Sequence, residues 1–111
     1  MPDVFQVLAD PTRRRIVDAL RAGERSVNEL VQVVDIGQPG VSRQLAILQD
    51  ADFVTVRPEG RRRLYALRPE PFRELSEFVT GYRAIWEGRL DRFGAALEKR
   101  RRDKNRKEKS R

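Results

Sequence analysis

The spacing of the apolar residues changes from helical to strand-like near Phe53 and returns to helical near residue 71, and this pattern constrains the fold more than any other feature. Up to about residue 48, apolar residues recur at the three- and four-residue spacing of helices, as Val41, Leu45 and Leu48 do. From Phe53 onward two short segments have the composition and spacing of strands. We therefore predict a mostly helical chain with one small β-hairpin.

Capping and turn residues divide the helical part. Asp10 followed by proline, and Ser26 with Glu29 three residues later, are typical helix starts. The expected elements are helices over 3–9, 11–22, 26–34 and from 38 onward, strands over 53–57 and 63–67, and a long last helix over about 71–98. The third and fourth helices, joined by a tight glycine-containing turn, form a helix-turn-helix pattern.

The composition excludes several classes of function. The chain has no cysteine and no histidine, so it lacks disulfides, thiolate metal ligands and the commonest general base. No phosphate-binding glycine loop or nucleophile–base pair is present. We therefore expect no catalytic residue, no metal site, no cofactor and no enzymatic activity. No apolar run approaches a membrane span and no signal peptide is recognisable, so we expect a cytoplasmic protein without a membrane partner.

The net charge of +7 is unevenly placed. Residues 99–111 contain nine Lys or Arg and two Asp or Glu, whereas residues 1–98 contain fifteen of each sign. We predict one folded domain over 1–98 and a basic, disordered tail over 99–111. Any DNA-binding face on the domain must then arise from local segregation of charge.

The fourth helix has polar residues between its apolar positions, near the end that a helix-turn-helix presents to base edges. Arg43 can donate twice to guanine, and Gln44 can pair with adenine. The alternative is the solvated face of an ordinary core helix, but the hairpin that follows favours DNA binding. The candidate recognition residues are Gln38, Gly40, Ser42, Arg43 and Gln44.

The hairpin tip contains three consecutive arginines, Arg61, Arg62 and Arg63. On a projecting loop they suit contact with phosphate or the minor groove. Alternatively, their charge keeps an exposed hairpin soluble and blocks edge pairing. Strand alternation places Arg62 on the side opposite to the other two, so at least one arginine is open to a structural role.

Three consecutive arginines, Arg13, Arg14 and Arg15, stand at the start of the second helix, where cations are locally unfavourable. Contact of Arg13 or Arg14 with the DNA backbone would explain them, and so would salt bridges to Asp10 or Asp18. Both explanations remain open from the sequence.

The last helix has an apolar stripe of roughly 42 Å, at 1.5 Å per residue, which is longer than a small body can cover. We predict a homodimer in which the first helix joins the last. The alternatives are a helix that only caps its own core, or a ligand pocket beside Tyr82 and Trp86. The candidate interface residues are Val4, Phe5, Leu8, Phe78, Tyr82, Ile85, Trp86, Leu90 and Phe93.

Over residues 3–97 the chain resembles the ArsR family of winged helix-turn-helix repressors. The resemblance is carried by LADPTRRRI at 8–16, by QPGVSRQLAIL at 38–48 and by the hairpin at 54–67. It implies a dimer built from the first and last helices, with the fourth helix in the major groove. It also implies a repressor or autorepressor that blocks double-stranded promoter DNA.

The chain departs from the family pattern in informative places. Ser26 and Asn28 stand where metal-sensing members have cysteines, so the chain is similar to the cysteine-free branch, without metal-regulated release. Whether an effector exists is open. Gln44 replaces a frequent histidine, and Asp52 replaces a frequent glycine that tolerates left-handed backbone better. The alternative function is a general or architectural nucleic-acid-binding protein driven by the basic tail.

Overall fold

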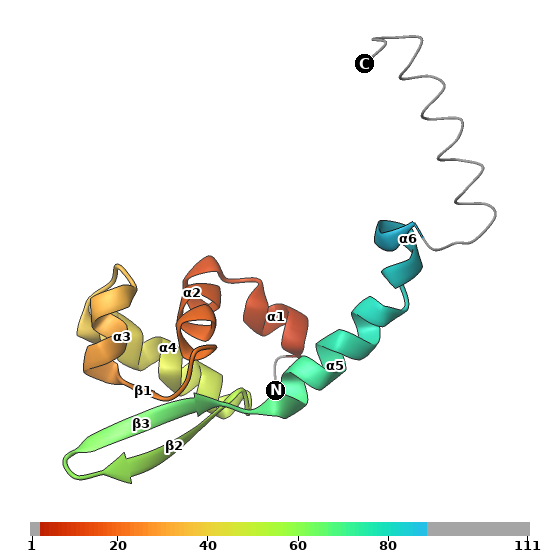
Figure 1. Cartoon of the computed structure of the whole chain (residues 1–111). Helices are drawn as coiled ribbons and strands as arrows, with labels where there is room; N and C mark the ends of the chain where they lie inside the picture. Colours follow the sequence, from red (N-terminus) through yellow and green to blue (C-terminus); the bar gives the residue numbers. More distant parts are fainter. Residues whose placement is uncertain (1–2, 89–111) are drawn as a thin grey trace, which may run out of the picture. The chain divides into compact units, whose positions relative to one another are not determined.

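The computed structural model describes residues 3–88. The chain divides into two compact units, residues 1–75 and 76–111, and each is described by itself. The elements are α1 (Val4–Leu8), α2 (Pro11–Leu20), β1 (Arg25–Ser26), α3 (Val27–Val33), α4 (Gln38–Asp50), β2 (Val54–Glu59), β3 (Arg62–Leu67), α5 (Pro69–Thr80) and α6 (Arg83–Glu87). Figure 1 shows α3 and α4 beside the β2–β3 hairpin.

Side-chain caps begin the first three helices. Asp10 accepts hydrogen bonds from the amides of Thr12 (2.8 Å) and Arg13 (3.2 Å), as predicted. The predicted capping box is confirmed, because Ser26 accepts from the Glu29 amide and Glu29 accepts from the Ser26 amide. These contacts satisfy amides that have no partner within the helix, so the sequence determines locally where each helix begins.

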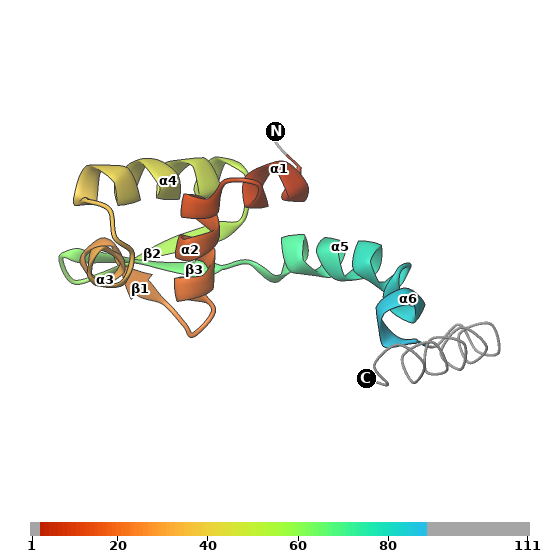
Figure 2. The ribbon, with the colours of Figure 1, turned by 90° about the horizontal axis from the view of Figure 1, so that it is seen from above.

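The core of the first unit is formed by helices α2, α3 and α4 packed on the sheet (Figure 2). The predicted inward residues of α4, Val41, Leu45 and Leu48, are all buried. The sequence predicts that Val4, Phe5 and Leu8 share one face of α1. This is partly wrong, because Val4 and Val7 are buried, whereas Phe5 is 44% exposed. The cause is the register of this single-turn helix, which turns Val7 inward in addition to Val4.

The sheet is antiparallel with the order β1-β3-β2. The predicted hairpin is present, but its strands are longer and its turn is reduced to Gly60 and Arg61. Of these two turn residues only Gly60 has a positive φ (63°), the pattern of a type II′ turn, which glycine favours. Strand β1 was not predicted, because two residues are too few to show alternation. Pro58 lies on the edge strand β2, where proline is tolerated.

The prediction of one continuous last helix over 71–98 is wrong. Helix α5 begins at Pro69 and ends at Thr80, and α6 ends before Gly88, whose φ is 66°. Around Gly81 the backbone bonds shorten to a three-residue spacing, with the Gly81 amide bonded to the Phe78 carbonyl (3.2 Å). Glycine weakens a helix by about 1 kcal/mol relative to alanine, which explains why the breaks coincide with glycines. Residues 89–98 lie outside the described part.

Among residues 3–88, no helix is long and apolar enough to cross a membrane. The predicted boundary at residue 98 and the predicted tail lie outside the described residues, so they stay predictions.

Candidate nucleic-acid interface

Helix α4 exposes a polar stripe opposite its buried face. Gln38, Ser42 and Arg43 are exposed, as their role in the predicted interface requires. The exposed face continues through Gln49, and also through Ala46, which is exposed but apolar. Sequence reasoning stopped at the first turns and missed this continuation, although the i, i+3 and i+4 spacing would have found it.

Gly40 has a packing role in α4. A Cβ atom added there would lie 3.2 Å from Cδ1 of Ile36, in the turn that precedes the helix. The glycine therefore lets the first turn of α4 approach this turn closely. A DNA contact by Gly40 could only be made by its backbone, and it stays a prediction.

Gln44 is half-buried and bonded to a residue of α2. Its Oε1 accepts a hydrogen bond from Nη1 of Arg13 at 3.3 Å. The same guanidinium donates to the carbonyls of Val7 (2.9 Å) and Gln6 (3.4 Å) and lies 3.6 Å from Asp10. The salt bridge to Asp10 that the sequence left open is therefore present. Arg13 satisfies carbonyls at the end of α1, a role that no local sequence signal revealed.

Arg14 has a similar role. Its Nη1 donates to the Leu8 carbonyl at 2.6 Å, so its guanidinium also contacts the end of α1. Both arginines proposed as DNA-backbone contacts thus have partners within the chain. The pKa of Asp10 is lowered by hydrogen bonds from the amides of Arg13 and Thr12 and by the charges of Arg13 and Arg14. Its carboxylate therefore remains ionised and keeps its contacts with the first turn of α2.

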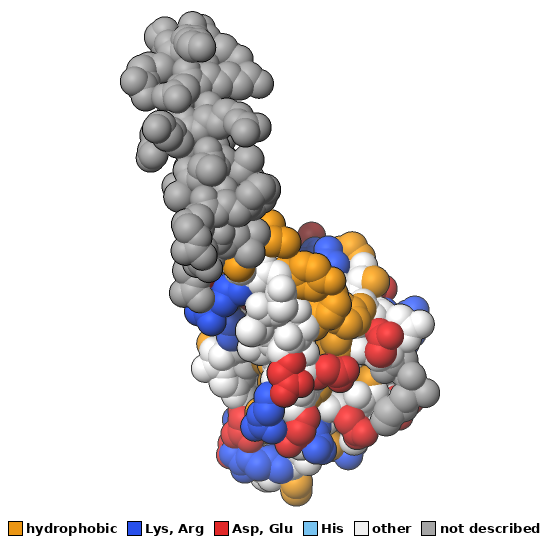
Figure 3. Space-filling model, turned by 90° about the vertical axis from the view of Figure 1, so that its right-hand side faces the viewer, with side chains coloured by type: hydrophobic (Ala, Val, Ile, Leu, Met, Phe, Trp, Pro, Cys, Tyr) orange, Lys and Arg blue, Asp and Glu red, His pale blue; other side chains and the backbone are white. Residues whose placement is uncertain are grey.

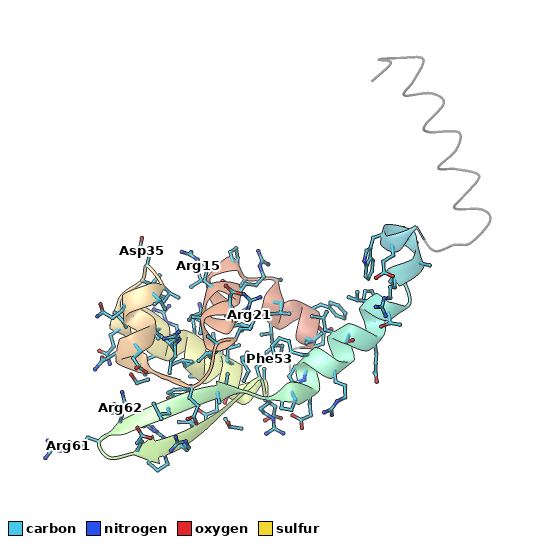
Figure 4. All side chains as sticks on the ribbon, viewed as in Figure 1. Arg15, Arg21, Asp35, Phe53, Arg61 and Arg62 are labelled. Atoms are coloured by element: carbon cyan, nitrogen blue, oxygen red, sulfur yellow. The ribbon has the colours of Figure 1, made fainter. Side chains whose placement is uncertain are left out.

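The hairpin arginines divide into paired and unpaired groups. Arg62 donates to Glu59 (3.0 Å) and lies 3.8 Å from Glu29 of α3. Arg61 and Arg63 have no ion pair or side-chain hydrogen bond within the described part of the chain. Figure 4 shows Arg61 pointing away at the hairpin tip. Alternation predicted this separation of Arg62 from its neighbours.

A second ion pair connects β2 of the hairpin to Glu24, the residue before β1. Arg57 donates twice to Glu24, at 2.7 and 2.8 Å, and once to Glu59. These bonds lower the pKa of Glu24, and the bond from Arg62 is the main cause of the lowered pKa of Glu59. The two glutamates therefore stay charged and partly neutralise the positive charge of the hairpin.

The second unit exposes an apolar surface. Phe78, Tyr82, Ile85 and Trp86 are 50–66% exposed, and the rings of Phe78 and Tyr82 lie 5.1 Å apart. Figure 3 shows hydrophobic side chains exposed on the face of the protein that it views. Exposed aromatic residues in such number are typical of an interaction surface. Leu90 and Phe93 of the predicted interface lie outside the described residues.

In the first unit, the predicted interface residues differ in burial. Val4 is only 3% exposed and belongs to the core of its own chain, so it offers no surface to a partner. Phe5 is exposed, and Leu8 lines an apolar groove of about 510 Å³ with Val17, Leu67 and Phe72 among its walls. Tyr82 and Trp86, where a ligand pocket was the alternative, are themselves more than half exposed.

Comparison with known proteins relates this architecture to regulators. Residues 8–57 match the helix-turn-helix domain family. The chain is 45% identical over 69 residues to the HTH-type transcriptional regulator Rv2034 of Mycobacterium tuberculosis, covering 61% of this chain and 64% of the relative. It is 33% identical over 67 residues to the transcriptional repressor SdpR of Bacillus subtilis, covering 60% of this chain and 74% of the relative. The match to Rv2034 thus spans less than two thirds of that protein.

Solved structures agree with these relatives. The crystal structure of an ArsR family transcriptional regulator is similar with a TM-score of 0.62 and 32% identity, covering 76% of this chain and 87% of that one. The homodimeric winged helix-turn-helix DNA-binding domain of Mb0332 from Mycobacterium bovis is similar with a TM-score of 0.62 and 26% identity, covering 76% and 79%. The winged helix-turn-helix fold predicted from the sequence is therefore confirmed.

Proposed function

Because the chain belongs to the ArsR family of transcriptional regulators, we propose that it is a sequence-specific repressor that binds promoter DNA as a homodimer. The observation that carries this proposal is the exposed polar stripe of α4, with Ser42 and Arg43 on a helix whose opposite face is buried. In a helix-turn-helix this stripe faces the major groove.

The proposed contacts fall into two classes. Arg43 reads a guanine through two hydrogen bonds, and Ser42 binds a base or a phosphate. At the hairpin tip, Arg61 and Arg63 contact phosphate or the minor groove, since neither has a partner within residues 3–88. Arg62 contributes chiefly to hairpin structure through Glu59 and Glu29. This division of roles separates base reading from backbone anchoring.

Dimerisation is proposed from the exposed apolar side chains of the second unit. Burying Phe78, Tyr82, Ile85 and Trp86 against a second copy would remove a large apolar area from water. The similar domain of Mb0332 is homodimeric. A two-fold dimer predicts a pseudo-palindromic site with half-sites about 34–36 Å apart or slightly more. The general nucleic-acid-binding alternative is not favoured, since the relatives are named regulators and repressors.

We also propose that no metal regulates this repressor and that it works in the cytoplasm. The proposal on metals rests on the sequence, which has no cysteine or histidine to hold a transition metal. Micromolar Zn(II), Cd(II) or arsenite should leave affinity for the operator unchanged. Release of the operator by any of them would contradict this.

The test of the function begins with selection of bound sequences from a random duplex pool, followed by competition with random duplex. A specific site should bind at least a thousandfold more tightly than random DNA, and a ratio near unity would overturn the proposal. Arg43→Ala should lose about 1–3 kcal/mol and relax one base position. Arg21→Ala, at an exposed residue paired with Asp18 at the end of α2, is the matched control.

A further inference from the structure

We propose that Arg13 is a positioning residue that fixes the side-chain amide of Gln44, so that Gln44 presents its NH₂ donor to DNA. This inference rests on the proposed function and adds a specificity rule to it. The observation behind it is the hydrogen bond from Nη1 of Arg13 to Oε1 of Gln44, which joins α2 to the recognition helix α4.

Arg13 is held firmly enough to orient another side chain. Its side chain is only 17% exposed, and the guanidinium also reaches the carbonyls of Val7 and Gln6 and the carboxylate of Asp10. Several acceptors around one planar group determine its position. A lysine could not replace it, because an ammonium group lacks the planar fork of donors that these acceptors require.

The chemistry of the pair determines which end of the amide faces Arg13. A guanidinium has donors and no acceptor, so only the oxygen of the Gln44 amide can bond to it. The NH₂ group then faces the other way. Gln44 lies in the same turn of α4 as the exposed Ser42 and Arg43.

The orientation changes what Gln44 can read. Recognition of adenine by glutamine uses both ends of the amide, the oxygen on N6 and the nitrogen on N7. With the oxygen turned toward Arg13, the amide cannot place both of its ends on one adenine. Its NH₂ donor then suits any base with a major-groove acceptor, namely guanine (O6 or N7), thymine (O4) or adenine (N7), whereas cytosine offers only a donor and is disfavoured. This orientation replaces the bidentate adenine pairing expected from the sequence by discrimination against cytosine.

The first experiment compares the full-length wild type with Gln44→Glu by selection from a random duplex pool. The glutamate has the same length and still accepts from Arg13, but its outward atom is an acceptor instead of a donor. We expect cytosine, which the wild type disfavours, to become preferred at one base position, with a loss of about tenfold or more on the original site. An unchanged base preference would overturn the inference.

The second experiment releases the amide. Arg13→Met should reduce base discrimination at that one position and leave the others intact. Arg14→Met is the matched control, since it removes a bond to the end of α1 (Leu8 carbonyl, 2.6 Å) without contacting Gln44. If thermal melting shows that Arg13→Met does not fold, Arg13→Lys replaces it, with the same expected loss. Retained discrimination in the folded variant would refute the role of Arg13.

The outcomes separate this inference from the proposed function. If the wild type selects no sequence from the pool, the proposed function fails. If it selects a site and neither variant changes the base preference there, only the positioning role of Arg13 fails.

Discussion

The backbone of Asp52 is strained, because this residue has a positive φ (60°) and is the only non-glycine residue among 3–88 that does. It follows α4 in a Schellman arrangement: the Asp52 amide bonds to the Gln49 carbonyl (3.0 Å), and the Phe53 amide to the Leu48 carbonyl (2.9 Å). Glycine is the usual residue at this position. We therefore predict that Asp52→Gly stabilises the protein.

The magnitude follows from three effects. Left-handed backbone costs a non-glycine residue about 1–2 kcal/mol, somewhat less for aspartate. A carboxylate at a helix C-terminus costs about 0.3–1 kcal/mol. Glycine loses about 0.5–1 kcal/mol more in chain entropy on folding. The net stabilisation is about 1 kcal/mol, or a rise in Tm of about 4 °C.

The assay is thermal and urea unfolding of the wild type and three variants. Asp52→Asn removes the charge and keeps a residue that tolerates positive φ, so it should gain only the charge component. Asp52→Ala removes the charge but tolerates the backbone poorly, so it should be less stable than Asp52→Asn. Two results would show that backbone strain at Asp52 does not limit stability. One is an Asp52→Gly variant no more stable than the wild type, and the other is an Asp52→Asn variant as stable as Asp52→Gly.

Three further outcomes are expected. Gly40→Val should destabilise the protein by about 1–3 kcal/mol in urea unfolding, because its side chain would crowd Ile36 in the turn before α4. Trp86→Asp should sediment as a monomer while keeping its helical circular dichroism, and a dimeric variant would place the interface elsewhere. Stability should fall as the pH drops below about 4.5, since hydrogen bonds from Ser26 lower the pKa of Glu29 in the folded state. Glu29→Gln retains the cap and should lose part of this pH dependence; an identical acid profile would contradict the assignment.

Local chemistry was readable from the sequence. The caps at Asp10 and Ser26 depend on residues two or three positions away, and the buried face of α4 depends on a repeat within one helix. Contacts between distant segments were not readable. Arg13 and Gln44 are separated by 31 positions, and Arg57 and Glu24 by 33. Their pairing follows from how α2, α4 and the hairpin pack, which no local pattern encodes.

The break in the last helix was missed for a different reason. The apolar stripe passes through Gly81 without interruption, so periodicity alone predicts a continuous helix. Glycine destabilises a helix by a predictable amount, but whether the helix breaks there depends on how its flanking residues pack, which is set by tertiary structure. For the same reason Val7 was missed as a core residue of α1, whose single turn is oriented by its contacts with the body.

The internal pairing of Arg57 and Arg62 has a consequence for counterion release. Arg57 and Arg62 already bind the carboxylates of Glu24 and Glu59, and a DNA phosphate would have to displace these carboxylates. The freed carboxylates would attract cations again, so the exchange would release few counterions in total. Only Arg61 and Arg63 can each release about 0.9 ion per phosphate contacted. The hairpin should therefore contribute about two units per protomer to the slope of log affinity against log salt, although four arginines lie on it.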